Sequence, residues 1–205
     1  SPLLAGTHVG SPRLGSTGPA MEGVTLKINN PDPTTGEGEI WAKGDNVMKG
    51  YYNDPEMTAE VLTPDGWFRT GDLGTFDKEG YLSIKGRLKN MIVGSSGENI
   101  YPEEIESVIN DFRHVVESLV VQKKGKLVAM VHLNMEELQA RYDNFRKEVS
   151  EQAGHYEEIV DAYLEEIRVY VNSKVNKFSQ LQVVVYQPEP FQKTATLKIK
   201  RFLYY

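Results

Sequence analysis

The sequence changes its pattern at Gly86-Arg87-Leu88-Lys89-Asn90, and this change strongly constrains how the chain can fold. Before it, short runs of alternating apolar and polar residues are separated by glycine, proline, asparagine and aspartate. That arrangement is typical of short strands joined by turns. After it, strand-like runs are mixed with helical periodicity. The sequence therefore predicts an α+β chain made of two bodies, residues 1–87 and residues 88–205.

The first body is expected to be a small antiparallel sheet or barrel. Alternating runs at Val24–Ile28 and Glu39–Gly44 are separated by turn residues. Two further short runs are predicted at residues 67–69 and 74–77. The residues from Asp77 to Gly80 are typical of a hairpin turn that leads into another strand.

The second body is expected to contain two hairpins and a last strand. Glycine and serine separate the runs at residues 90–93 and 98–101, which predicts the first hairpin. Apolar, β-branched runs at residues 115–121 and 127–133 predict the second. Residues 182–186 are the last predicted strand.

Helices are predicted at three places. Asp54, followed by a proline, is expected to cap a short helix. Residues 102–112 carry apolar side chains at helical spacing, with acidic residues in the first turn. Residues 135–178 predict two amphipathic helices: one carries Leu138 and three later apolar residues, and the other extends to Phe178.

Composition limits the classes of function. The formal charge of -6 argues against a protein that mainly binds nucleic acid, because phosphate contacts require a basic excess. The absence of cysteine excludes disulfides and thiolate metal sites and fits a reducing, cytoplasmic location. No apolar run approaches the roughly 20 residues of a membrane-spanning helix. The first residues resemble the interior of a longer chain, so we expect a fragment.

Four features could carry chemistry, and each has a simpler interpretation. Asp72 could accept hydrogen bonds from two ribose hydroxyls, or it could cap a turn. Arg87 could bind ribose oxygens or a phosphate, or form a surface ion pair. The loop Gly94–Gly97 could admit a ligand close to the backbone, or could be only a hairpin turn. The basic residues between 193 and 201 could simply be a solvated tail.

The joint order of these features closely resembles the motifs of the adenylate-forming acyl-CoA synthetase family, especially its long-chain fatty-acid branch. The resemblance covers almost the whole chain except residues 135–180. The segments that carry it are Gly38-Glu39-Ile40 through Gly50-Tyr51-Tyr52-Asn53-Asp54-Pro55-Glu56-Met57-Thr58, Trp67-Phe68-Arg69-Thr70-Gly71-Asp72-Leu73-Gly74, Gly86-Arg87-Leu88-Lys89-Asn90, Gly97-Glu98-Asn99-Ile100-Tyr101-Pro102-Glu103-Glu104-Ile105-Glu106 and Lys193-Thr194-Ala195-Thr196-Leu197-Lys198-Ile199-Lys200-Arg201.

The resemblance implies a reaction in which a fatty or other carboxylic acid and ATP form an acyl-adenylate, which coenzyme A then converts to a thioester. It implies that Asp72 holds the ribose hydroxyls and that Arg87 contacts ribose or phosphate. Ile84 would pack near the adenine. Lys198 would be the catalytic residue that reaches the carboxylate and the α-phosphate, and Gly97 would line the pantetheine tunnel.

In the family, the small C-terminal domain rotates between the two half-reactions, and Lys89 matches the hinge. The chain departs from the family pattern at Asn90, where aspartate is common, and at Leu197, where glycine is usual. The glycine-, serine- and threonine-rich phosphate loop does not occur in it, nor does the tyrosine-glycine motif that helps to bind adenine and Mg²⁺. The resemblance thus implies that residues 1–87 end a large domain and residues 88–205 form a mobile lid.

Two alternatives remain open at this point. The acceptor could be an acyl carrier protein, because it presents the same pantetheine arm as coenzyme A. The chain could instead be a stand-alone interaction module whose helices at residues 135–180 dock on a partner. The acidic excess of those helices favours a solvated helical pair and, at most, peripheral membrane contact.

Overall fold

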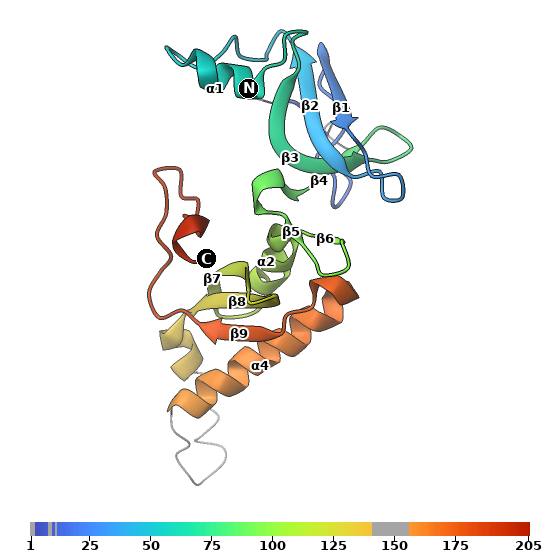
Figure 1. Ribbon diagram of the computed structural model, residues 1–205. Coiled ribbons are helices and arrows are strands. Elements are labelled where there is room, and N and C mark those ends of the chain that lie inside the picture. Colours follow the sequence, from blue (N-terminus) through green and yellow to red (C-terminus); the bar gives the residue numbers. More distant parts are fainter. Residues whose placement is uncertain (1–2, 8–9, 11, 141–155) are drawn as a thin grey trace. The chain divides into compact units, whose positions relative to one another are not determined.

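The computed structural model describes residues 3–7, 10, 12–140 and 156–205 (Figure 1). Contacts between residues divide the chain into two compact units, residues 1–90 and residues 91–205. The division lies at the end of the stretch where the sequence pattern changes. The roles of the two units stay predictions.

The first unit contains a four-stranded antiparallel sheet with the order β1-β2-β3-β4. A short helix, α1 (Pro55–Val61), lies between the second and third strands in the sequence. Because the strand order is linear, the sheet is open, and the alternative of a closed barrel is wrong. The strands are β1 (Val24–Asn29), β2 (Gly38–Gly44), β3 (Phe68–Phe76) and β4 (Leu82–Arg87).

Strand β3 is one continuous strand, whereas the sequence predicts two separate runs. Gly71 adopts a φ of 71°, which a residue without a Cβ tolerates. The register with β4 shifts between Leu73 and Gly74, so the strand continues past an irregularity. The Thr70 hydroxyl donates to the Ile40 carbonyl at 2.7 Å and links β3 to β2 where their pairing is interrupted.

Two local signals of the first unit are confirmed. The Asp54 side chain caps α1 by accepting a hydrogen bond from the Met57 N–H at 2.9 Å. The hairpin turn between β3 and β4 is closed by the Asp77 side chain, which accepts from the N–H groups of Glu79 and Tyr81 at 2.9 Å each. Both elements therefore form for the reasons that the sequence indicates.

The second unit is built on a three-stranded sheet of order β7-β8-β9. The first two strands are antiparallel, and the last is parallel to β8. A small hairpin precedes helix α2, and Figure 1 shows α4 lying along β9. The elements are β5 (Ile92–Val93), β6 (Asn99–Ile100), α2 (Pro102–Asn110), β7 (Val115–Lys123), β8 (Lys126–Leu133), α4 (Tyr156–Lys174) and β9 (Val183–Tyr186).

The three-stranded sheet is covered on both faces. Helices α2 and α4 pack on one face and bury Ile109 and Tyr163 completely. On the other face, Leu119 and Val121 pack against Phe191 of the C-terminal tail, residues 190–205. Phe191 is only 3% exposed. The tail that contains the predicted catalytic lysine is therefore also part of a hydrophobic core.

The predicted helical pair differs from the structure at its end. Residues 135–140 are helical, and the predicted positions Tyr142, Phe145 and Val149 lie outside the described residues. Helix α4 ends at Lys174 and does not extend to Phe178. The Asn176 side chain accepts hydrogen bonds from the N–H groups of Phe178 and Ser179 and starts the short 3-10 turn η2 (Lys177–Ser179).

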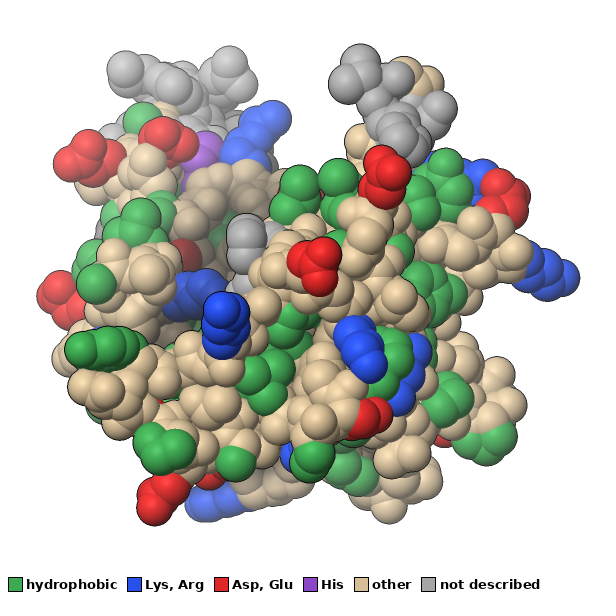
Figure 2. Space-filling view, turned by 90° about the horizontal axis from the view of Figure 1, so that it is seen from above, with side chains coloured by type: hydrophobic (Ala, Val, Ile, Leu, Met, Phe, Trp, Pro, Cys, Tyr) green, Lys and Arg blue, Asp and Glu red, His purple; other side chains and the backbone are tan. Residues whose placement is uncertain are grey.

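The surface drawn in Figure 2 is mixed in character. Lysine and arginine side chains are interspersed with acidic and apolar ones, and they do not form one continuous basic area on this face. Among the helices of the described residues, none is both long and apolar enough to cross a membrane.

Candidate functional site

Asp72 and Arg87 face each other across the β3–β4 pair, where they are register partners. Arg87 Nε lies 2.9 Å from Asp72 Oδ1, and Arg87 Nη1 donates to the Thr70 carbonyl at 3.2 Å. The Asp72 side chain remains 31% exposed and the Arg87 side chain 41% exposed. The pair is thus held in place by the sheet while staying accessible to a ligand. A surface ion pair has the same geometry, so binding of ribose stays a prediction.

The strand backbone just before Asp72 is held by Glu39, for which the sequence predicts no role. Its carboxylate accepts from the Gly71 N–H at 3.1 Å and from the Trp41 indole N–H at 2.7 Å. The Asp72 N–H donates to the Thr70 hydroxyl at 3.0 Å. These bonds fix the backbone that carries the aspartate. The signal in the sequence is that Glu39 and Trp41 are two positions apart in a strand and therefore lie on the same face of it.

Ile84 and Lys89 lie on the same unit as this pair. Ile84 is on β4 opposite Gly74, and half of its side chain is exposed. It therefore offers apolar surface on the sheet that carries Asp72 and Arg87. Lys89 is exposed within the 3-10 turn η1 (Leu88–Asn90), at the end of the first unit. Neither contact with adenine nor hinge movement is tested by these positions.

The Gly97 loop belongs to the second unit and closes the β5–β6 hairpin. The Gly97 N–H donates to the Gly94 carbonyl at 3.1 Å, and the Gly94 N–H donates to the Glu98 carbonyl at 2.8 Å. Gly97 has a φ of 87°, and a Cβ at this position would meet nothing within 4 Å. In this chain the glycine is therefore required by its backbone conformation. A role in a pantetheine tunnel stays a prediction.

Lys198 lies on an exposed loop of the C-terminal tail. The Thr194 N–H donates to the Lys198 carbonyl at 2.8 Å, and the Leu197 N–H donates to the Thr194 carbonyl at 2.9 Å. The Lys198 ammonium makes no ion pair with any residue that the structure describes. Leu197 adopts a φ of 61°, so leucine occupies a left-handed position where the family usually has glycine.

The predicted site residues thus fall into two groups. Asp72, Ile84 and Arg87 lie on one sheet of the first unit. Gly97 and Lys198 lie on two separate loops of the second unit. Their joint use in one active site stays a prediction.

Two buried carboxylates of the second unit were not singled out from the sequence. Glu106 on α2 and Glu117 on β7 are each only 9% exposed. Burial raises the pKa of Glu106 to about 7, although the Arg201 guanidinium and the hydrogen bond from the Val120 N–H act in the opposite direction. Glu117 could have been noticed as an acid that interrupts an apolar strand.

Candidate metal ligands are not clustered among the described residues. No group of three or more histidine, aspartate or glutamate side chains that could hold a metal ion occurs among them. Asp72 offers an acceptor and Arg87 a donor, and these groups fit the hydroxyl and phosphate groups of a nucleotide.

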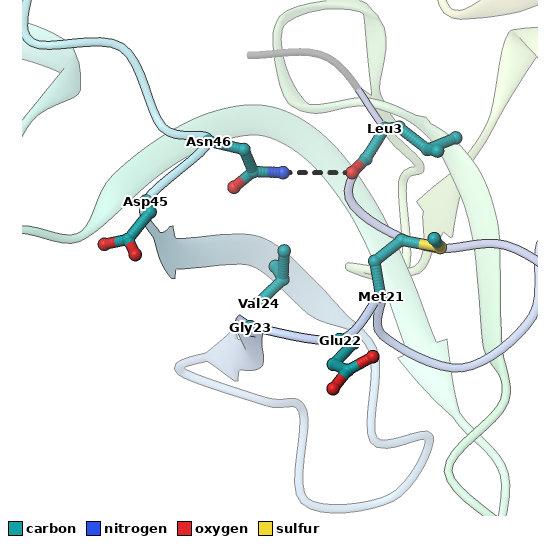
Figure 3. Close-up of a pocket in the computed structure, with 7 residues that line it drawn as sticks. All are labelled: Leu3, Met21, Glu22, Gly23, Val24, Asp45 and Asn46. Atoms are coloured by element: carbon teal, nitrogen blue, oxygen red, sulfur yellow. Dashed lines mark hydrogen bonds between the residues drawn. The ribbon is translucent and has the colours of Figure 1, made fainter.

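A cavity of about 410 Å³ lies in the first unit, away from the predicted site residues. Figure 3 shows the Asn46 side chain reaching the Leu3 carbonyl across it, with a hydrogen bond of 3.1 Å. No predicted site residue lines it. The lining residues are Leu3, Met21, Glu22, Gly23, Val24, Asp45 and Asn46.

Comparisons with known proteins find several likenesses, although no model of a protein family matches the chain. The chain is 44% identical over 126 residues to the long-chain-fatty-acid–CoA ligase FadD13 of Mycobacterium tuberculosis, covering 58% of this chain and 25% of that protein. It is 42% identical over 132 residues to the indoleacetate–CoA ligase of Aromatoleum aromaticum, covering 60% and 26%, respectively.

Among solved structures, the chain resembles the O-succinylbenzoate coenzyme A synthetase MenE of Bacillus subtilis in complex with AMP. The TM-score is 0.70 and the identity is 28%, over 94% of this chain and 35% of that one. The chain therefore spans about a quarter of the curated relatives and about a third of this structural neighbour.

Proposed function

Because this chain belongs to the adenylate-forming acyl-CoA synthetase family, we propose that it is the C-terminal part of an AMP-forming acid–thiol ligase. Residues 1–87 end the large domain in this proposal, and residues 88–205 are the mobile lid. The ligase joins a carboxylic acid to coenzyme A at the expense of ATP. The motifs that carry the family resemblance occur in both units, which supports a role in both half-reactions.

The observation that carries the proposal is the Asp72–Arg87 pair on adjacent strands. A carboxylate accepts hydrogen bonds from the two vicinal hydroxyls of a ribose, and a guanidinium donates to ribose or phosphate oxygens. The 2.9 Å contact and the bond from Arg87 to the Thr70 carbonyl hold both groups before a nucleotide arrives. Ile84 offers its exposed side chain to the adenine of the same nucleotide.

Lys198 acts in the first half-reaction. A carboxylate oxygen of the acid forms a bond to the α-phosphorus of ATP. The bond from the α-phosphorus to the oxygen that bridges it to the β-phosphorus breaks, and pyrophosphate leaves. Negative charge develops on the phosphoryl oxygens, and a positioned ammonium stabilises it without forming a covalent bond. The exposure of Lys198 and its lack of an ion pair with the described residues leave the ammonium available for this task.

The second half-reaction forms the thioester. The thiolate sulfur of coenzyme A forms a bond to the acyl carbon. The bond from that carbon to the phosphate oxygen breaks, and AMP leaves. Gly97 borders the path of the pantetheine arm, and Lys89 is the hinge about which the lid turns between the two steps. The exposed position of Lys89 supports this role, because a solvated side chain tolerates a large backbone rotation.

We further propose that the carboxylic acid substrate is a long-chain fatty acid, because the chain is similar to FadD13. The likeness to the indoleacetate ligase makes an aryl acid the competing substrate. Initial rates of acyl-CoA formation by the complete ligase, with a long-chain fatty acid and with indoleacetate, compare the two. A higher kcat/KM for indoleacetate would contradict the choice of acid but not the ligase activity.

The test of the proposed function is Lys198→Ala in the complete ligase. We expect acid-dependent exchange of pyrophosphate into ATP to fall by about 10²- to 10³-fold, which is the usual effect of removing one charge-stabilising donor. Thioester formation from a supplied acyl-adenylate should be spared. Lys126→Ala, which removes an exposed lysine of β8, is the matched control. Pyrophosphate exchange near the wild-type rate in Lys198→Ala would refute the role of Lys198.

A further inference from the structure

The loop that carries Lys198 is anchored on both of its arms by buried carboxylates. The loop comprises residues 191–201, and its two arms are residues 191–194 and 198–201. Glu117 of β7 contacts the first arm, and Glu106 of α2 contacts Arg201 at the end of the second arm. Each carboxylate is 9% exposed. Between the two anchors the chain turns back on itself, and the lysine lies near the tip.

The first anchor joins the tail to an edge strand of the sheet. Glu117 Oε1 accepts a hydrogen bond from the Phe191 N–H at 2.8 Å, and Glu117 Oε2 lies 2.5 Å from Lys193 Nζ. The same carboxylate therefore binds the tail at two points, two residues apart. Phe191 also inserts its ring against Leu119 and Val121 on the sheet. The start of the loop is thus fixed by both polar and apolar contacts.

The second anchor lies at the open edge of β7. Glu106 Oε1 accepts from the Val120 N–H at 2.7 Å, and Glu106 Oε2 forms an ion pair with Arg201 Nη2. Arg201 Nη2 is also 3.7 Å from Glu103 Oε1. Only 15% of the Arg201 side chain is exposed. The residue that ends the loop is therefore held in a largely buried ionic network.

The two arms are paired with each other between the anchors. The Lys200 N–H donates to the Gln192 carbonyl at 2.8 Å, and Lys193 and Ile199 form an antiparallel bridge. Because the two arms are paired, fixing their anchored ends also fixes the end of the loop where Lys198 is exposed. Nothing among the described residues holds the lysine side chain directly by an ion pair.

We propose that Glu106 and Glu117 are positioning residues for Lys198: together they fix the base of the loop and thereby the point from which the ammonium reaches the reacting phosphate. This inference rests on the function proposed for Lys198. Its physical basis is the steep dependence of catalysis on geometry, because a misplacement of about 1 Å can cost about 100-fold in rate. A buried carboxylate without its cationic partner is strongly unfavourable, so each ion pair also disfavours a detached loop.

The first test measures order of the loop without any activity assay. Amide hydrogen exchange in the 205-residue chain is compared between wild type, Arg201→Gln and Lys193→Gln. We expect faster exchange at the N–H groups of Thr194, Leu197 and Lys200 in both variants. Exchange in α4 should stay at the wild-type rate, which shows that the fold persists. Arg168→Gln, which breaks the exposed Glu165–Arg168 pair of α4, is the matched control and should leave the loop unchanged.

Unchanged exchange of the loop amides in both anchor variants would overturn the inference. If Arg201→Gln loosens the whole second unit, Arg201→Lys decides the matter, because it retains the charge and loses the second nitrogen of the fork. Local acceleration confined to the loop in Arg201→Lys supports the inference. Loop exchange equal to wild type in Arg201→Lys and Lys193→Gln overturns it.

The second test links order to chemistry in the complete ligase. We expect Arg201→Gln and Lys193→Gln each to lower kcat for pyrophosphate exchange by about 10- to 100-fold, with KM for ATP unchanged. The effects of Glu117→Gln and Lys193→Gln should not add, because these residues share one contact. Arg201→Lys should lower kcat less than Arg201→Gln does, and Arg168→Gln should leave kcat unchanged.

The two tests separate failure of this inference from failure of the proposed function. If Lys198→Ala leaves pyrophosphate exchange intact, the function of Lys198 is wrong whatever the anchors do. If Lys198→Ala abolishes exchange while the anchor variants keep wild-type kcat, the proposed function stands and the positioning role is wrong.

Discussion

Leu197 has a backbone conformation that leucine rarely adopts, and its side chain is 80% exposed. The left-handed region costs a residue with a Cβ about 1–2 kcal/mol, whereas glycine enters it freely. We expect Leu197→Gly to raise the free energy of unfolding by up to about 1 kcal/mol, since part of the gain is offset by the greater freedom of glycine in the unfolded chain. Urea unfolding followed by circular dichroism measures this change.

The control for Leu197 is Leu203→Gly, which removes another exposed leucine of the tail. Leu203 lies in the 3-10 turn η3 (Arg201–Leu203) and has no left-handed backbone. Glycine should lower stability there by about 0.5–1 kcal/mol. A loss of stability in both variants would show that the strain at Leu197 is not the limiting factor.

Glu106 predicts a dependence of stability on pH. Burial raises the pKa of this carboxyl in the folded chain from 4.5 to about 7, so the folded state binds the proton more tightly than the unfolded state. The contribution of Glu106 to stability is therefore fully present below about pH 4.5 and is lost as the pH rises through about 7. This difference in pKa between the folded and unfolded chain corresponds to about 3 kcal/mol of unfolding free energy.

Glu106→Gln isolates this contribution. Glutamine cannot ionise. The unfolding free energy of the Glu106→Gln variant should therefore fall less steeply between about pH 4.5 and about pH 7 than that of the wild type. Chemical unfolding of both proteins at several pH values in that window measures the difference. Parallel pH profiles of the two proteins would show that Glu106 ionises in the folded chain as it does in the unfolded one.

At the scale of the element, α1 depends on its first hydrogen bond. None of the residues of this helix is buried, so capping is a large share of what stabilises it. We expect Asp54→Ala to lower the free energy of unfolding by about 1 kcal/mol, because the Met57 N–H loses its acceptor. Asp54→Asn keeps an acceptor oxygen and should cost much less. Thermal unfolding measures both variants. Equal losses of unfolding free energy would show that the hydrogen bond of the cap does not stabilise the helix.

Elements with local signals could be predicted from the sequence, and elements that depend on distant partners could not. Helix α2 and the β7–β8 hairpin follow from apolar spacing and from a short turn. The sequence predicts strand β9, but the parallel pairing of β9 with β8 joins residues more than 50 positions apart and has no local sequence signal. The continuity of β3 depends likewise on its neighbours in the sheet, which bridge an interruption at Gly71.

The same distinction applies to the candidate site. The sequence identifies Asp72, Arg87 and Lys198 as candidates, but the direct pairing of Asp72 with Arg87 becomes evident only from the strand register. The roles of Glu106 and Glu117 depend on contacts with the tail, which lies 74 or more positions away in the sequence. The apolar residues around Glu117 indicate that this acid is buried, but its partners in the tail cannot be predicted from the local sequence.

At the scale of the molecule, the chain consists of two units with Lys89 at their junction. In the proposed complete ligase, we expect Lys89→Pro to slow thioester formation more than adenylate formation, because proline would restrict the backbone rotation proposed for the second step. Single-turnover measurements of the two half-reactions compare the effects. Lys89→Arg keeps a long, solvated side chain and is the control. Equal slowing of both steps by proline would argue against a hinge.

The tail that bears Lys198 also covers one face of the β7-β8-β9 sheet through Phe191, Ile199 and Tyr204. A stop codon just before Phe191 would therefore do more than delete Lys198. It would leave Leu119 and Val121 uncovered in water and favour aggregation or degradation of the shortened protein. A nonsense allele at this point would act by lowering the abundance of the protein, whereas changing Lys198 alone would test the proposed role of the lysine in a chain that keeps its fold.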